Sequence, residues 1–115
     1  MILKSETIQP FDFDSLSIRD FTATLNTSSS LAHIRVSPRA HHRRAWSKEC
    51  DKYYYVISGE LQFMLDSLEH TLKAGDVCIV PQGHKFSYVN TTETPVELLL
   101  LHTPRFNMDA EVFDE

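Results

Sequence analysis

The 115-residue chain contains little of several residue types that mark whole classes of protein. It has only three glycines and five prolines beside an aromatic share of 10%, which argues against a disordered or low-complexity chain. Basic residues are outnumbered, 11 to 16, and the net charge of −5 gives no reason to expect nucleic acid as a partner. One short basic cluster, residues 41–44, stands alone.

Long apolar runs are also missing. The longest, Leu98 to Leu101, is far shorter than the roughly 20 residues of a membrane span. The start of the chain lacks the apolar run of a signal peptide. Cys50 and Cys78 have no spacing typical of a zinc or redox motif, and a disulfide between them is left open. We therefore expect a cytoplasmic protein that has no membrane partner.

What the chain does contain is a series of short apolar or β-branched runs separated by turn residues, in a length that suits one domain. Such spacing is typical of an all-β sandwich or barrel. The only helix we expect is a turn in the tail after Pro104. The predicted strands are Phe21 to Leu25, Leu31 to Val36, Tyr53 to Ser58, Leu61 to Leu65, His70 to Leu72, Val77 to Val80, Phe86 to Asn90 and Val96 to Leu101.

Two segments have the spacing of known motifs. Gly75, Pro81, Gly83 and Asn90 match four positions of G-x5-P-x-G-x2-H-x3-N, the second motif of the cupin family. Gly59 matches the end of the first motif, H-x-H-x3,4-E-x6-G. The chain therefore resembles a small cupin over about residues 31–104. The resemblance implies a cupin-type β-barrel, or jelly roll, with residues 1–30 as an N-terminal strand or arm and 105–115 as a tail.

The resemblance breaks at the metal site. In cupins that bind metal, two histidines and a glutamate of the first motif and a histidine of the second are the ligands. A gapless count places Ala45, Ser47, Lys52 and Phe86 at these four positions. Alanine and phenylalanine have no donor atom, and lysine adds a repelling charge. We therefore expect no cofactor, and metal-dependent chemistry is not implied.

Other histidines offer an alternative divalent-metal site. His41 and His42 precede the expected ligand pair, and His84 lies two residues before Phe86. Adjacent strand residues point to opposite faces, so His41 and His42 cannot both point inward from a regular strand. We favour surface positions for all three.

Strand alternation and the family's geometry together predict the lining of the barrel. An inward Lys52 needs a partner or a lowered pKa, unless it reaches the mouth of the barrel. Glu49 and Asp51 are the nearest carboxylates along the sequence. The predicted pocket consists of Ala45, Ser47, Lys52, Tyr54, Phe86, Tyr88 and Asn90.

Three functions remain open. We favour a small-molecule-binding domain without metal, such as a sensor, carrier or accessory protein, that holds an anionic or polar ligand beside Lys52. The second is a metal-independent isomerase or epimerase for a sugar or small acid, with His84, His102 or Lys52 as the base. The third is a metal cupin with non-standard histidines. The fold alone does not decide among them.

We also expect a homodimer. Residues 53–57 and 98–101 are apolar on both faces, and a barrel can bury only one face inside itself. A second protomer is the favoured cover because two-fold dimers are the commonest oligomers. The segment Ile2 to Ile18 could instead cover this face within one chain.

Overall fold

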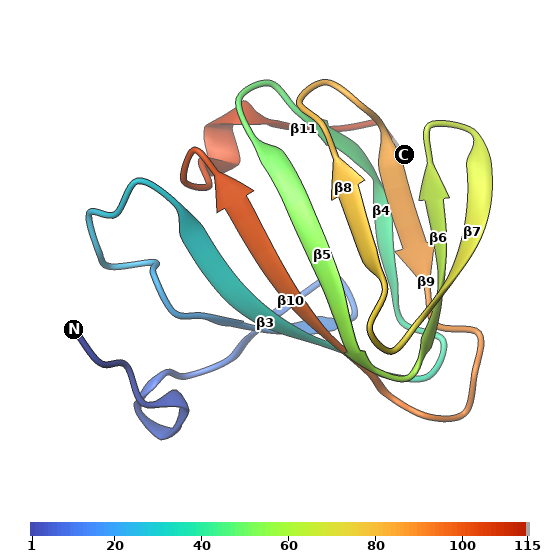
Figure 1. Ribbon diagram of the computed structural model, residues 1–115, viewed down its shortest axis with the longest axis horizontal. Helices are drawn as coiled ribbons and strands as arrows, with labels where there is room; N and C mark the ends of the chain where they lie inside the picture. Colours follow the sequence, from blue (N-terminus) through green and yellow to red (C-terminus); the bar gives the residue numbers. More distant parts are fainter. Residues whose placement is uncertain (115) are drawn as a thin grey trace.

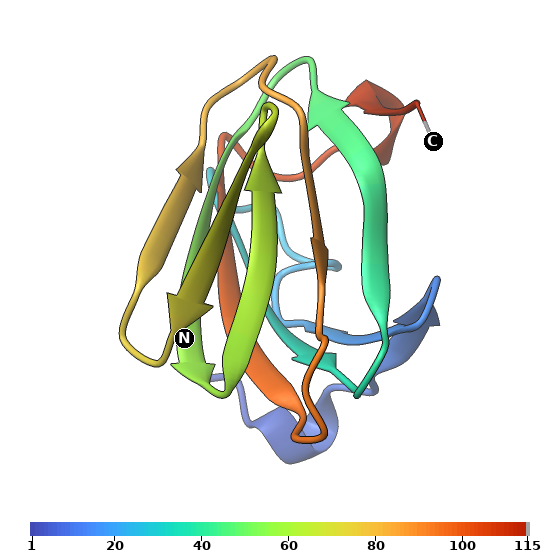
Figure 2. The same cartoon turned by 90° about the vertical axis from the view of Figure 1, so that its right-hand side faces the viewer.

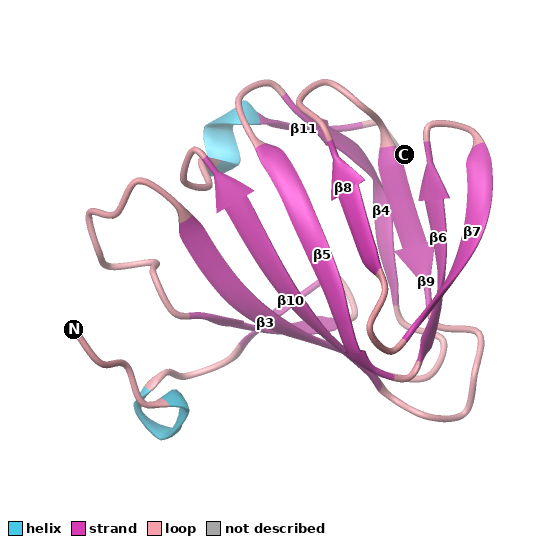
Figure 3. Cartoon of the chain, in the orientation of Figure 1, coloured by secondary structure: helices cyan, strands magenta, loops and turns pink. Residues whose placement is uncertain are grey.

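The computed structural model describes residues 1–114 and is built almost entirely of β-strands (Figure 3). Two single turns of 3-10 helix, Ser5–Thr7 and Met108–Ala110, are its only helical elements within that range. The predicted all-β fold is confirmed. The strands are β1 Phe11–Phe13, β2 Leu16–Asp20, β3 Ser30–Val36, β4 His41–Ser47, β5 Asp51–Ser58, β6 Glu60–Leu65, β7 Leu68–Lys73, β8 Val77–Val80, β9 Phe86–Val89, β10 Val96–Thr103 and β11 Glu111–Phe113.

The strands form two antiparallel sheets that face each other (Figures 1 and 2). Six strands in the order β1-β2-β3-β10-β5-β8 make the first sheet, and five in the order β11-β4-β9-β6-β7 make the second. The blue N-terminal hairpin and the red C-terminal segment lie on the same side of the molecule, next to β4 (Figure 2). The Phe13 and Phe113 rings, 5.8 Å apart, join these two segments.

Alternation along the strands places one face of each sheet in a common core. On β5, Lys52, Tyr54 and Val56 point inward and are buried, while Tyr55 and Ile57 are exposed. This pattern follows from the two-residue repeat of a strand. The same repeat along β3 and β10, which belong to the same sheet, places their aliphatic side chains beside those of β5 on the inner face.

The motif residues that carried the resemblance make turns. Gly59 has φ of +89°, and a Cβ there would lie 2.9 Å from the carbonyl oxygen of Pro95. The fully buried Asn90 side chain donates to Val36 O at 3.0 Å and to Thr94 O at 2.8 Å. Gly59 and Asn90 therefore hold the turns that join the strands.

The prediction of a strand at Phe21 to Leu25 was wrong. The Asp20 carboxylate accepts from Thr22 N at 3.0 Å and turns the chain there. The N-terminal strands are instead β1 and β2, a hairpin that pairs with β3 of the same chain. Strands β4 and β11 were also not predicted.

The outer face of the six-stranded sheet keeps a patch of exposed apolar side chains. The N-terminal hairpin pairs at the sheet edge and leaves this face uncovered. The patch consists of Leu31, Tyr55, Ile57, Val77, Ile79 and Leu101. Cys50 and Cys78 are both buried free thiols, so the disulfide left open above is not formed. No helix within residues 1–114 has the length and apolarity to cross a membrane.

Candidate functional site

A cavity of about 340 Å³ lies between the two sheets and is lined by residues of both sheets, of the N-terminal hairpin and of the C-terminal segment. This volume suits a small organic molecule. Most of the wall is apolar. Its lining residues are Phe11, Phe13, Leu16, Ile18, Asp20, Ser30, Ala32, Ile34, His42, Lys52, Tyr54, Tyr88, Leu100, His102, Phe106, Met108, Glu111 and Phe113.

The polar centre of the cavity is a cluster of three buried side chains from β5, β10 and β11. Lys52 Nζ donates to Glu111 Oε1 at 2.6 Å and lies 3.0 Å from His102 Nε2. The side chains of Lys52 and Glu111 are only 4% and 3% exposed. His102 reaches Lys52 because the two residues are direct partners in the β5–β10 ladder. The partner of Lys52 is therefore Glu111, and the expectation of Glu49, Asp51 or the barrel mouth was wrong.

Burial controls the protonation of this cluster. It lowers the pKa of the Lys52 ammonium, and the nearby Glu111 carboxylate opposes that shift. Burial, assisted by the Lys52 charge, lowers the pKa of His102 to about 3. His102 is thus neutral at pH 7, and an ammonium that donates to Nε2 requires the ring proton to be on Nδ1. The cluster as a whole carries no net charge.

Polar atoms of the cluster remain without partners. His102 Nδ1 and Glu111 Oε2 are buried and find no hydrogen bond among residues 1–114. Buried polar atoms of this kind are costly, and in native proteins they usually meet water or a ligand. The Phe106 ring packs against His102 with the ring centroids 4.9 Å apart.

His42, on β4, lines the cavity from the opposite sheet. Its Nδ1 lies 2.6 Å from Arg43 O, and a carbonyl can only accept, so Nδ1 carries the proton and Nε2 keeps a lone pair. Burial lowers the pKa of His42 to about 4. The ring packs against Phe86 and Tyr88 at 4.8 and 5.3 Å. His42 is therefore a neutral base inside the pocket, and the prediction of a surface position was wrong.

A β-bulge explains why His42 points inward. Along the β4–β9 ladder His42 pairs with Tyr88, and Ala45 pairs with Phe86, so β4 has one extra residue between these pairs. Regular alternation back from the inward Ala45 would turn Arg43 inward and His42 outward. The bulge reverses this, while His41 stays exposed.

Two tyrosines complete the inner wall. Tyr54 and Tyr88 are buried, with ring centroids 5.6 Å apart in an edge-to-face arrangement. Burial raises the pKa of both phenols well above the ordinary range, so both are neutral hydroxyls. Lys52, Tyr54 and Tyr88 are thus the predicted pocket residues that line the cavity.

The other four predicted pocket residues are buried but do not line the cavity. Ala45 is fully covered, and the Ser47 hydroxyl accepts from Cys50 N at 2.9 Å. Asn90 holds its loop, as described above. Phe86 belongs to a packed aromatic group and lies 5.8 Å from Tyr54. Aromatic rings fill this part of the barrel, so the open space lies nearer the chain termini.

His84 lies outside the site. Its Nδ1 is 2.9 Å from Asp66 Oδ2 in a pair whose side chains are about half exposed. We therefore withdraw His84 as a catalytic or metal-binding candidate. The sequence did not predict the inward side chain of His42 or the place of Glu111, Phe106 and Phe113 in the cavity wall. Glu111 lay outside the motif region, and no local pattern marked it.

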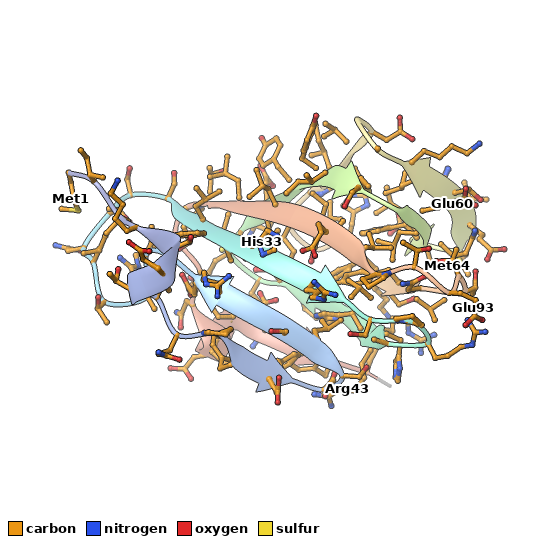
Figure 4. All side chains as sticks on the ribbon, turned by 90° about the horizontal axis from the view of Figure 1, so that it is seen from below. Met1, His33, Arg43, Glu60, Met64 and Glu93 are labelled. Carbon is orange, nitrogen blue, oxygen red and sulfur yellow. The ribbon has the colours of Figure 1, made fainter. Side chains whose placement is uncertain are left out.

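Adjacent arginines on β4 hold the two terminal segments that wall the cavity. Arg43 Nε donates to Asp14 Oδ2 at 3.0 Å, and its guanidinium lies 4.4 Å from the Phe113 ring centroid. Figure 4 shows Arg43 beside the turn of the N-terminal hairpin. Arg44 Nε donates to Asp114 Oδ1 at 2.9 Å. Each side of the cavity is thus anchored to the same strand.

The donor set does not fit the metal ion that metal-binding cupins hold. No three histidine, cysteine, aspartate or glutamate side chains within residues 1–114 come together in a way that could hold an ion. Glu111 and His102 both face an ammonium group, which repels a divalent cation. We therefore derive no chemistry from a metal.

Comparisons with known proteins agree with the fold. A family model described as a cupin domain matches residues 32–102. Pac13 from Streptomyces, described as a nucleoside dehydratase, has a similar structure, with a TM-score of 0.88 at 20% identity over 100% of this chain and 91% of its own. A sugar phosphate isomerase of the cupin superfamily from Silicibacter pomeroyi gives 0.76 at 23% identity, over 90% and 75%.

Among curated proteins, the endoribonuclease YbeY of Myxococcus xanthus is 25% identical over 95 residues. The match covers 81% of this chain, which spans only about a third (32%) of that relative's length. These likenesses show the fold and not a shared activity.

Proposed function

The chain belongs to the cupin family, and from that premise we propose that its cavity binds a small, uncharged polar molecule without a metal ion. The observation that carries this proposal is the buried cluster of Lys52, Glu111 and His102 at the centre of an otherwise apolar cavity. Lys52 already has a carboxylate partner, so the reason for an anionic ligand is weakened. A neutral ligand with hydroxyl, carbonyl or amide groups suits the unpaired atoms of the cluster.

The aromatic walls favour a ligand that carries a flat ring. Phenyl rings line the cavity from both termini, and Tyr54 and Tyr88 close its inner end. Flat rings pack well against such faces. A nucleoside combines a flat heterocycle with hydroxyl groups, and the likeness to Pac13, solved with uridine, supports uridine as the first probe.

A thermal-shift series tests the proposal. We expect uridine to raise the melting temperature of the wild type by mass action. The His42→Gln variant, altered inside the cavity, should respond less. His84→Gln is the matched control because it makes the same substitution outside the site, and it should respond as the wild type does. Small acids that stabilise the wild type where nucleosides and sugars do not would contradict an uncharged ligand.

Independence from metal is tested separately. Protein purified without an affinity tag and dialysed against a chelator should contain no stoichiometric transition metal. About one zinc, iron, nickel or manganese ion retained per chain would overturn this part of the proposal.

A second candidate function is acid–base catalysis, and His42 is the observation that favours it. A neutral imidazole with a free Nε2 lone pair can take a proton from a bound ligand, and His102 can pass its Nδ1 proton to the ligand while Nε2 takes a proton from the Lys52 ammonium. The same pair would serve an isomerisation, an epimerisation or an elimination of water. A ligand from the thermal-shift series, incubated in deuterated water, should then exchange a carbon-bound proton with wild type and His84→Gln but not with His42→Gln. The absence of exchange with wild type would favour the binding function alone.

A further inference from the structure

The surroundings of Lys52 Nζ are those of a site for an organic cation. A carboxylate oxygen lies at 2.6 Å and an imidazole nitrogen at 3.0 Å, and both are hydrogen-bond acceptors. The rings of Phe86 and Phe106 each have their centroid 5.5 Å from Nζ. Phenyl faces attract an ammonium through their negative π surface, and aromatic cages with a carboxylate bind such ligands.

This arrangement suits an ammonium better than a metal ion. Divalent metals need several nitrogen, oxygen or sulfur ligands, and the two phenyl rings supply none. An ammonium needs acceptors for its three N–H groups, and aromatic faces attract its charge. The cluster offers two acceptors, and the third N–H has no acceptor among residues 1–114.

We propose that Glu111, His102, Phe86 and Phe106 form a cation site which the chain fills with its own Lys52 ammonium, in the barrel where metal cupins hold an ion. Lys52 is thus a tethered cation, and its third N–H is available to an oxygen atom of a ligand. The contact between the third N–H and a ligand oxygen rests on the proposed function, whereas the cation site itself does not.

Chemical rescue tests the site without any knowledge of the natural ligand. Lys52→Ala removes the last four atoms of the side chain, and n-propylammonium has the same three carbons and one nitrogen. We expect n-propylammonium to raise the melting temperature of Lys52→Ala by about 4 °C or more. The neutral isostere 1-propanol and sodium chloride at equal concentration should have little effect.

Lys52→Met is the matched control because it fills the space that Lys52→Ala leaves open. It should not respond to n-propylammonium. Equal stabilisation of Lys52→Ala by 1-propanol and n-propylammonium would show an ordinary cavity and overturn the proposal, as would no stabilisation by the amine. These outcomes do not depend on uridine, so failure here differs from failure of the proposed function.

A measurement on the wild type covers the case in which Lys52→Ala does not fold. Long-range proton–nitrogen spectra report which ring nitrogen of a histidine carries the proton. We expect His102 in the neutral Nδ1–H form at pH 7, with Nε2 accepting from Lys52. The Nε2–H form would mean that His102 is not a ligand of the ammonium, and it would overturn the cation site.

Discussion

Replacement of Glu111 by glutamine removes one charge from the buried cluster and leaves nearly the same shape. The amide oxygen can still accept from Lys52 Nζ, so the main loss is the counter-charge of the ammonium. Breaking a buried ion pair from one side typically costs about 3–5 kcal/mol. At pH 7 the loss cannot exceed about 5 kcal/mol, because Lys52 in the variant can give up its proton instead of remaining an unpaired charge. Removing the proton from a lysine with an ordinary pKa near 10.4 costs about 1.4 kcal/mol for each pH unit below that pKa.

This ceiling gives the prediction its pH dependence. At pH 9 the ammonium can be neutralised for about 2 kcal/mol, so the deficit of Glu111→Gln should shrink between pH 7 and pH 9. Urea unfolding followed by fluorescence of the single tryptophan, Trp46, measures the free energy of unfolding. Trp46 is a suitable reporter because it pairs with Val112 on β11, next to Glu111.

An exposed pair provides the control. Arg39 and Glu93 form an ion pair whose side chains are 62% and 82% exposed, and Glu93→Gln should cost less than about 1 kcal/mol. The double variant Lys52→Met/Glu111→Leu should recover most of the stability, because an apolar pair of similar size replaces the charges. A deficit for Glu111→Gln no larger than that of Glu93→Gln, or one that does not change with pH, would refute the reasoning.

Three further predictions follow from the fold. The pKa of His42 and of His102 is lowered on folding from 6.5 to about 4 and about 3, so the unfolded state binds protons first as the pH falls. The free energy of unfolding, measured with urea, should therefore drop between pH 6.5 and pH 4 by about 3 kcal/mol per histidine, and less steeply in the double glutamine variant. Light scattering should give a mass near twice 13.2 kDa, and Ile79→Lys on the exposed apolar face should give a monomer; a wild-type monomer would contradict the dimer. Gly59→Ala should cost about 2 kcal/mol or more and Gly83→Ala less, because both have positive φ but a Cβ at Gly83 meets open space; equal losses would show that only the backbone angle matters.

The parts of the fold that were predictable are those determined by neighbouring residues. Gly75, Pro81 and Gly83 carried the turn spacing of the second motif. The strands around them alternate as expected, since a two-residue repeat needs no knowledge of the distant chain. The N-terminal hairpin was harder to predict because β1 has only three residues. A strand that short gives no periodic signal.

The site depended on features that a local pattern does not reveal. Sequence alternation correctly turned Lys52 inward, but its partner Glu111 lies 59 residues further along the chain. Only the pairing of β11 with β4 brings that carboxylate back. The orientation of His42 was missed because one bulged residue reverses the alternation.

The two adjacent arginines of β4 make the cavity sensitive to ionic strength. The Arg43–Asp14 and Arg44–Asp114 pairs are partly exposed, so dissolved salt screens them over a Debye length of about 8 Å at physiological concentration. The buried Lys52–Glu111 pair is shielded from that screening. Concentrated salt should therefore loosen the hold on both terminal walls while the charged cluster stays intact. Binding of even an uncharged ligand would then weaken as salt is added, through the protein and not through the ligand.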